Sequence, residues 1–389
     1  MLLPVLAGDI DVAAPHPKVL DFKKRRRHVP TPEEAFDECV KQCPKGEMND
    51  GLFVPLFNGR QDIDGVEEED LRSLLVGIKA NMNRWLADRK QVDHHIDDLP
   101  FHFDYIDSKV STAVAFRGNS YAFIGMTVKF VEDLRQTSRD LSRAKGVRQI
   151  FNFDDGREDG LELVFFDNLL NLTIAHEFTH HVHGHVLRQD GIAKFFIEFD
   201  GSEPEEGLLR QAEESDADGY GAYHVLANAI DGSMRISTAR AIGLQNMPEA
   251  HLDEVIYLIF LVAICAQFTI RGLLDIRDGN GGFINVWAKS HPPQAARLDC
   301  LMRHAVLWCE ANRPALAVFT TQRRFREIMS TVAEAMWGPE SHKPWDEQAA
   351  FLRTEKGIEY MKALTSVIDA QKKELGKNSS KASGAAGSY

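Results

Sequence analysis

Two histidines and a glutamate lie close together near the middle of the chain, in the segment His176-Glu-Phe-Thr-His180. Four residues separate the histidines, so on a helix both imidazoles project from one face, one turn apart. Two neutral ring nitrogens at that spacing can bind one zinc ion, and Glu177 beside them can accept a proton from a water that the ion activates. This HExxH pattern predicts a zinc hydrolase.

The residues around this pattern predict a helix. Apolar side chains repeat at every fourth position, at Leu170, Ile174, Phe178, Val182 and Val186. That stripe lies about 200° around the helix from the two histidines of the motif, so the core face and the metal-binding face are separate. We expect the neighbouring His181 to be exposed and His183 to support the metal ligands from behind.

A third ligand must come from elsewhere in the chain, because a catalytic zinc usually has three protein ligands and a water. His183 is unsuitable, since seven residues of helical rise place it about 10.5 Å from His176. A motif with a further histidine at position 186 is excluded, because that residue is Val186.

The best candidate for the third ligand is Glu214, in the segment Glu213-Glu-Ser-Asp-Ala-Asp218. Asp218 follows four residues later and would share a helix face with it, where a carboxylate can receive the outward N–H of a ligating histidine. Gly219 and Gly221 come next and would suit close packing against the HExxH helix. The alternative is that these acids form a solvated face of the helix.

Together these motifs resemble a known family of enzymes. The pattern HExxHxxxGH from His176 to His185, followed by Glu-x-x-Ala-Asp, is similar to the gluzincin family that contains the CAAX prenyl-proteases and HtpX-type peptidases. Residues 103–125 resemble the paired strands before that family's zinc helix, and Ser290-His-Pro-Pro-Gln-Ala-Ala-Arg297 resembles its later HPxxxxR element. The resemblance implies a zincin-like fold, a zinc ion held by two histidines and a glutamate, and endopeptidase activity.

A second positive or hydrogen-bonding group is needed beside the metal to stabilise the oxyanion of peptide hydrolysis. The resemblance favours His291 and Arg297 as catalytic groups of this kind, and the other candidates are Tyr220, Tyr223 and His224.

The chain departs from the family in two ways, which put the substrate class in doubt. Many members are embedded in membranes, whereas this chain shows no convincing membrane span. In addition, residues 137–161 look like an insertion before the zinc helix. A soluble HExxH peptidase of phage-exclusion type is a second relative that the sequence resembles.

Composition narrows the class of protein. With 389 residues, 44% hydrophobic and 26% charged, the chain is typical of a soluble globular protein. Its net charge of −13 argues against nucleic-acid binding. The basic run at residues 23–27 is interpreted as a solvated linker, with a docking patch as the alternative. Five sparse cysteines argue against disulfides and indicate a reducing compartment, so we expect a cytoplasmic protein.

The longest apolar run, residues 255–270, falls short of the roughly 20 residues that cross a bilayer. It predicts a buried core helix, and a membrane-dipping segment is the alternative. Thr31-Pro-Glu-Glu predicts a capped helix start, and Arg117-Gly-Asn-Ser120 a hairpin. Further helices are expected over 70–87, 126–144, 294–312, 320–337 and 346–375, with an acidic loop at 195–206.

The sequence therefore predicts a mainly helical α+β fold with a small sheet beside the HExxH helix. Residues 1–30 would be a flexible arm, 31–95 a helical extension, 96–375 the metallopeptidase domain and 376–389 a disordered tail. The leading hypothesis is a zinc endopeptidase acting on a protein or peptide substrate. The alternatives are a catalytically silent, zinc-stabilised regulatory or interaction protein, and a histidine-rich metal buffer.

Overall fold

The structure is a computed structural model of the full chain. It describes residues 29–43, 46–49, 52–89, 99–118, 120–153, 156–188, 194–195, 204–270, 276, 283–289, 291–319 and 321–385. The expected arm up to residue 28, with its basic run, and most of the expected acidic loop at 195–206 lie outside the described residues.

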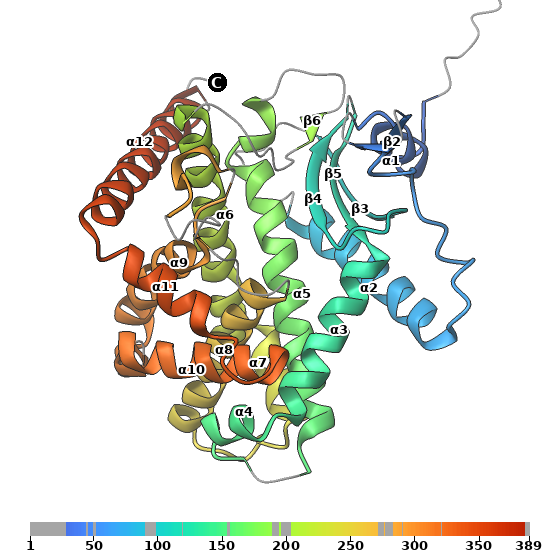
Figure 1. Cartoon of the computed structure of the whole chain (residues 1–389). Helices are drawn as coiled ribbons and strands as arrows, with labels where there is room; N and C mark the ends of the chain where they lie inside the picture. The colour runs from blue at the N-terminus through green and yellow to red at the C-terminus, as the bar shows by residue number, and fades with distance from the viewer. Residues whose placement is uncertain are drawn as a thin grey trace, which may run out of the picture.

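A small mixed sheet forms one side of the molecule (Figure 1). Its strands, in the order β3-β5-β4-β6, are β3 (Phe101–Ile106), β5 (Ala122–Thr127), β4 (Ala113–Arg117) and β6 (Lys194–Phe195). β3 pairs with β5 in parallel, and β4 pairs with β5 antiparallel. The predicted hairpin joins β4 to β5, and its turn is closed by a 3.1 Å hydrogen bond that the Gly118 N–H donates to the Tyr121 carbonyl.

The N-terminal elements cover this sheet. They are α1 (Pro32–Lys41), the hairpin of β1 (Gly46–Asn49) and β2 (Leu52–Pro55), and α2 (Glu69–Arg89). Phe36 of α1 packs on the outer face against Phe116 and Phe123. Alternate residues, such as Phe103, point to the other face and share a core with Leu75 of α2. The predicted extension, residues 31–95, therefore shares its core with the predicted catalytic domain.

Helices make up most of the remaining structure and lie on the inner side of the sheet (Figure 1). They are α3 (Val128–Arg143), α4 (Lys145–Ile150), α5 (Glu158–Val182), α6 (Pro204–Asp231), α7 (Ser233–Ala241), α8 (Glu249–Thr269), α9 (Gln294–Asn312), α10 (Gln322–Trp337), α11 (Lys343–Phe351) and α12 (Glu355–Ala385). Three 3₁₀ turns join them, namely η1 (His185–Arg188), η2 (Val286–Ala288) and η3 (Pro314–Phe319). The predicted mainly helical α+β class is confirmed.

Helix α8 runs through the centre of the helical layer. By length and composition it could cross a membrane, and 83% of its most apolar stretch is buried inside the protein. At 21 residues it is longer than the apolar run that predicted it. The expected core position of residues 255–270 is confirmed by side chains such as Phe260 and Leu261, which are fully buried.

Several local predictions hold. Thr31 caps α1 in a capping box with Glu34, and α9 has the predicted bounds. The expected single helix over 346–375 is wrong, because the chain turns between α11 and α12. Thr354 Oγ1 accepts a hydrogen bond from the Gly357 N–H there, and a Cβ at Gly357 would lie 2.1 Å from the Phe351 carbonyl oxygen. This close approach of two helix ends requires glycine.

Two predicted segments contain more helix than expected. Residues 137–161, interpreted as an insertion, form the end of α3, all of α4 and the start of α5. α12 continues to Ala385, so part of the segment 376–389 is helical, and residues 386–389 lie outside the described residues.

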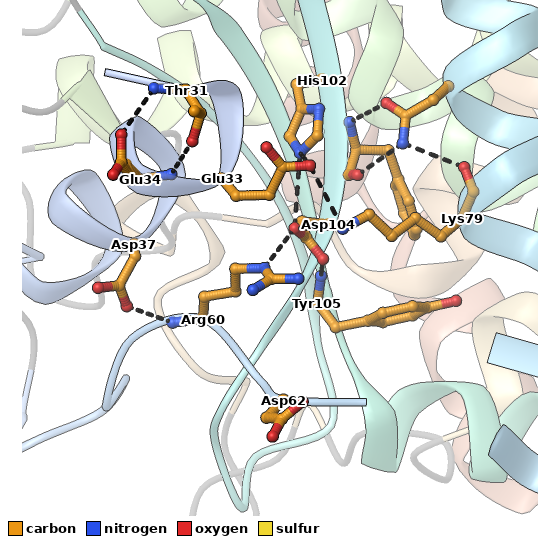
Figure 2. Close-up of polar contacts among 12 residues, drawn as sticks. Thr31, Glu33, Glu34, Asp37, Arg60, Asp62, Lys79, His102, Asp104 and Tyr105 are labelled. Carbon is orange, nitrogen blue, oxygen red and sulfur yellow. Dashed lines mark hydrogen bonds and ion pairs between the residues drawn. The ribbon is translucent and has the colours of Figure 1, made fainter. Parts of the chain in front are cut away.

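A buried carboxylate joins the N-terminal elements to the sheet (Figure 2). Asp104 of β3 is fully buried, and its Oδ2 accepts hydrogen bonds from Arg60 Nε at 2.6 Å and Lys79 Nζ at 2.7 Å. His102 Nε2 lies 3.5 Å from the same oxygen. Burial alone would raise the pKa of Asp104, but these donors outweigh it and hold the pKa at about 2. Ionisation of this carboxylate therefore stabilises the fold.

We predict that this carboxylate makes stability fall in acid. The folded-state pKa lies below the ordinary value of 3.8, so the stabilisation of about 2 kcal/mol is present above pH 4 and is lost as the pH falls toward 2. Urea unfolding of the wild type and of Asp104→Asn at pH 5 and pH 3 isolates the effect, because other carboxylates titrate in both proteins. The stability advantage of the wild type should shrink by about 1 kcal/mol at pH 3. An unchanged advantage would contradict the assignment.

Candidate metal centre

The HExxH motif lies near the end of α5, where this helix packs against α6. A Cβ at Gly221 of α6 would lie 3.0 Å from the backbone nitrogen of His176, so only glycine allows the two backbones to come this close. The predicted packing role is thereby confirmed for Gly221. Gly219 instead faces the ring of His304 on α9, 2.7 Å from where its Cβ would be. The apolar stripe that predicted α5 is buried throughout.

Three side chains from α5 and α6 converge at this contact. The Nε2 atoms of His176 and His180 are 3.0 Å apart. Glu214 Oε2 lies 3.5 Å from His176 Nε2, and Glu214 Oε1 lies 3.5 Å from His180 Nε2. The three residues form a group that could hold a metal ion. The structure therefore brings together the three predicted ligands, from segments more than thirty residues apart.

The distances among these three side chains are compatible with one metal ion between them. Nitrogen and oxygen ligands at about 2.0–2.1 Å from a tetrahedral ion are about 3.3 Å apart. The distances among the histidine nitrogens and the glutamate oxygens here, 3.0–3.5 Å, lie on either side of that value. The donor set of two imidazoles and a carboxylate is also a common one for zinc. The residues present therefore fit such an ion.

Asp218 supports this group from α6. Its Oδ1 lies 3.0 Å from His176 Nδ1, so it can receive that N–H when the opposite ring nitrogen binds a metal. Arg297 of α9 donates to both oxygens of Asp218, at 2.7 and 2.8 Å, and its Nη2 also lies 3.2 Å from Glu214 Oε2. Arg297 thus holds two carboxylates of α6 in place.

The remaining predicted site residues border the same cavity, of about 670 Å³. His291 Nε2 lies 3.2 Å from Glu214 Oε2, and Glu177 lines the cavity together with His176. Apolar side chains complete the wall, among them Phe130, Leu172 and Phe268. The other oxyanion candidates, Tyr220, Tyr223 and His224, are not among the described residues that line it.

The acids of α6 are buried, which contradicts the alternative of a solvated acidic face. Glu213, Glu214, Asp216 and Asp218 are 2–7% exposed. Burial would raise the pKa of Glu214, but the charges of His291, His176 and Arg297 outweigh it and lower the pKa. For Asp218 burial is likewise outweighed, by Arg297 and His176, and its pKa is lowered. These carboxylates are anionic, as ligands and their supports must be.

The pKa values of the two imidazoles of the motif are shifted in opposite directions. Burial holds the pKa of His180 well below its ordinary value, and the neighbouring histidines act in the same direction, so this ring is neutral. Burial also lowers the pKa of His176, but its hydrogen bond to Asp218 and the charge of Glu214 outweigh that effect and raise it.

The expectation that His181 is exposed is wrong. The side chain is buried, its Nε2 lies 2.8 Å from the Phe123 carbonyl oxygen, and burial lowers its pKa to about 4. The reason is that β5 packs against α5 on the side where His181 lies. The helical spacing of residues in the sequence does not show which faces of a helix other elements cover. His183 does lie close behind the ligands, where it contacts Asp216.

Two further groups of side chains have metal-binding composition. Glu33, His102 and Asp104 form the first, but Arg60 and Lys79 already donate to Asp104, and a divalent cation would have to displace both (Figure 2). The second consists of His183, His185 and Asp216. The sequence pointed to neither Asp216 nor His185 as a site residue, although the HExxHxxxGH pattern includes His185.

No family model matches this chain, and no curated protein or solved structure is significantly similar to it.

We predict that Glu214→Gln abolishes tight metal binding, because a neutral amide replaces the anionic ligand. Metal content of the purified proteins, measured by elemental analysis, checks this. Glu213→Gln is the matched control, since it makes the same change at the adjacent buried position and should retain the ion of the wild type. Equal metal content in the two variants would rule out residue 214 as a ligand.

Gly221→Ala should push α5 and α6 apart, because the added methyl meets the backbone at His176 rather than a flexible side chain. We expect a loss of roughly 1–3 kcal/mol in the free energy of unfolding. Gly77→Ala in α2 is the control: its Cβ would meet nothing within 4 Å, so it should stabilise the protein by up to about 1 kcal/mol. Urea denaturation compares the two, and a neutral effect at residue 221 would disprove the tight contact.

Proposed function

We propose that the protein is a zinc-dependent endopeptidase of zincin-like, gluzincin type. The observation that carries the proposal is the convergence of His176, His180 and Glu214 at ligand distances in a cavity that Glu177 also lines. The resemblance of the motifs to the CAAX prenyl-protease and HtpX family supports the same assignment. When bound, zinc would supply a Lewis acid that polarises a peptide carbonyl and lowers the pKa of water toward about 7.

Three polar residues of the cavity then have separate roles. Glu177 takes a proton from the attacking water and passes it to the leaving amine. His291, whose Nε2 faces the site, donates a hydrogen bond to the oxyanion. Arg297 is fully engaged with Asp218 and Glu214, so we assign it to positioning these carboxylates rather than to direct contact with substrate.

The substrate would be an extended segment of a protein or peptide. Ala113, the first residue of β4, and Thr112 just before it line the cavity. On its outer side β4 pairs with β6 only at Phe116 and Arg117, so among the described residues its first half has an open edge. An extended chain can add to such an edge through main-chain hydrogen bonds, and the apolar cavity wall would accept a hydrophobic side chain.

The proposed setting is the cytoplasm. All five cysteines are free, as expected in a reducing compartment, and three of them, Cys265, Cys300 and Cys309, are buried in the helical layer. The negative net charge disfavours nucleic acid as a partner.

Glu177→Gln tests the chemistry apart from the metal. Without the carboxylate base we expect cleavage of an unfolded protein substrate to fall about 10²–10⁴-fold, while metal content stays at the wild-type level. Glu162→Gln is the matched control, because it makes the same change on α5 at a residue that pairs with Arg139 and does not line the cavity. Glu162→Gln should cleave like the wild type.

The same variant distinguishes the alternatives. A catalytically silent, zinc-stabilised regulatory protein would keep its biological effect in Glu177→Gln, whereas a peptidase would lose it. A histidine-rich metal buffer would bind several ions per chain, and one tightly held zinc by elemental analysis rejects it.

A further inference from the structure

A second buried group of histidines and an aspartate lies directly behind the proposed metal ligands. Asp216 is on α6, two residues after Glu214, and is 4% exposed. His183 caps the end of α5, and Gly184, with φ of 72°, turns the chain so that His185 begins η1. His185 is 1% exposed. The proposed hydrolysis uses none of these residues, although His185 and Asp216 are buried and His183 is half-buried.

The shortest distance in this group is that of a hydrogen bond rather than that between two ligands of one ion. His183 Nδ1 lies only 2.5 Å from Asp216 Oδ2, much closer than the roughly 3.3 Å between two ligands of a tetrahedral ion. His185 Nε2 lies 3.4 Å from the same oxygen. Both imidazoles therefore converge on one carboxylate oxygen, which leaves no room for an ion between His183 and Asp216.

The group is connected to the metal ligand His180. The Nδ1 atoms of His180 and His185 are 2.9 Å apart, and both side chains are about 1% exposed. A nitrogen–nitrogen distance of this kind requires one donor and one acceptor. Which ring donates follows from the metal site: when Nε2 of His180 binds an ion, the proton of that neutral ring must be on Nδ1.

The remaining protons follow from that assignment. His180 donates from Nδ1 to Nδ1 of His185, so His185 carries its own proton on Nε2, which faces Asp216 Oδ2. His183 donates from Nδ1 to the same oxygen. The result is a continuous chain of donors and acceptors that runs from the metal ligand to a buried anion.

We propose that His185, Asp216 and His183 form a positioning network that fixes the tautomer and orientation of His180 as a metal ligand. The proposal rests on the metal site proposed above. It gives the two ligating histidines parallel supports, since His176 is held directly by Asp218 and His180 indirectly by Asp216 through His185. Both supporting carboxylates lie on α6, the helix that also carries Glu214.

The test measures zinc affinity by competition with a chromophoric chelator. Removing such a support typically weakens metal binding 10–100-fold. We expect that loss in His185→Phe, which keeps a ring but no acceptor, and in Asp216→Asn, which removes the anion. His185→Asn should fall between these variants and the wild type, because its amide oxygen can replace Nδ1 as acceptor. His181→Asn is the matched control: it alters a buried histidine next to His180 that hydrogen-bonds to the Phe123 carbonyl and packs against Phe101, outside the network, and it should bind zinc normally.

Two further readouts separate positioning from a general loss of structure. The double variant His185→Phe/Asp216→Asn should bind zinc no more weakly than His185→Phe alone, because Asp216 acts on His180 through His185. In the zinc-loaded wild type, NMR should show a slowly exchanging Nδ1 proton on His180 that is lost in His185→Phe. If His185→Phe does not fold, Asp216→Asn and His185→Asn provide the same comparison.

The outcomes are distinct. Wild-type affinity in both Asp216→Asn and His185→Asn, or additive losses in the double variant, would overturn the network. A second zinc ion per wild-type chain that Asp216→Asn loses would show instead that this group is a metal site. If Glu214→Gln retains its metal, the proposed metal centre itself fails, whereas loss of metal there with unchanged affinity in the His185 variants defeats only the network.

Discussion

The close approach of α5 and α6 at Gly221 is the constraint on which the site depends. Ligand atoms must lie within about 2 Å of one ion, so a shift of half an ångström between the helices would separate the glutamate from the histidines. α5 supplies His176 and His180, and α6 supplies Glu214. A side chain at position 221 would meet the backbone of His176. Glycine therefore occupies the position at which the two helix backbones have the least room between them.

Burying so many charges at one contact would be costly without partners. An unpaired carboxylate in a protein interior costs several kcal/mol, and α6 buries four. Asp218 is paired with Arg297 and His176, and Asp216 lies against His183 and His185. The burial that raises each pKa is outweighed by these partners. Neighbouring side chains thus hold these carboxylates ionised and in place.

The sheet and the N-terminal elements place the other wall of the cavity. Asp104 links β3 to α2 and to the segment containing Arg60, and β5 and β4 follow in register beside it. His181 Nε2–H donates a hydrogen bond to the Phe123 carbonyl of β5, so the sheet is also tied to the helix that carries the HExxH motif. These contacts position the start of β4, whose outer edge is unpaired among the residues that the structure describes, next to the cavity. The predicted extension is therefore part of the framework around the site.

Much of this could be predicted from local patterns. The four-residue spacing of His176 and His180, the apolar stripe of α5, the Glu214–Asp218 pair, the capped start at Thr31 and the bounds of α9 all follow from helical periodicity and capping chemistry, which act within a few residues. These local features do not depend on which distant segments pack against them. Only the tertiary structure decided that His181 is buried, that the chain breaks between α11 and α12, and that Asp216 and Asp104 find their partners. Those features depend on which elements pack together, because residues distant in sequence set a side chain's burial and its hydrogen bonds. The spacing of residues within one segment does not show how those distant residues are arranged.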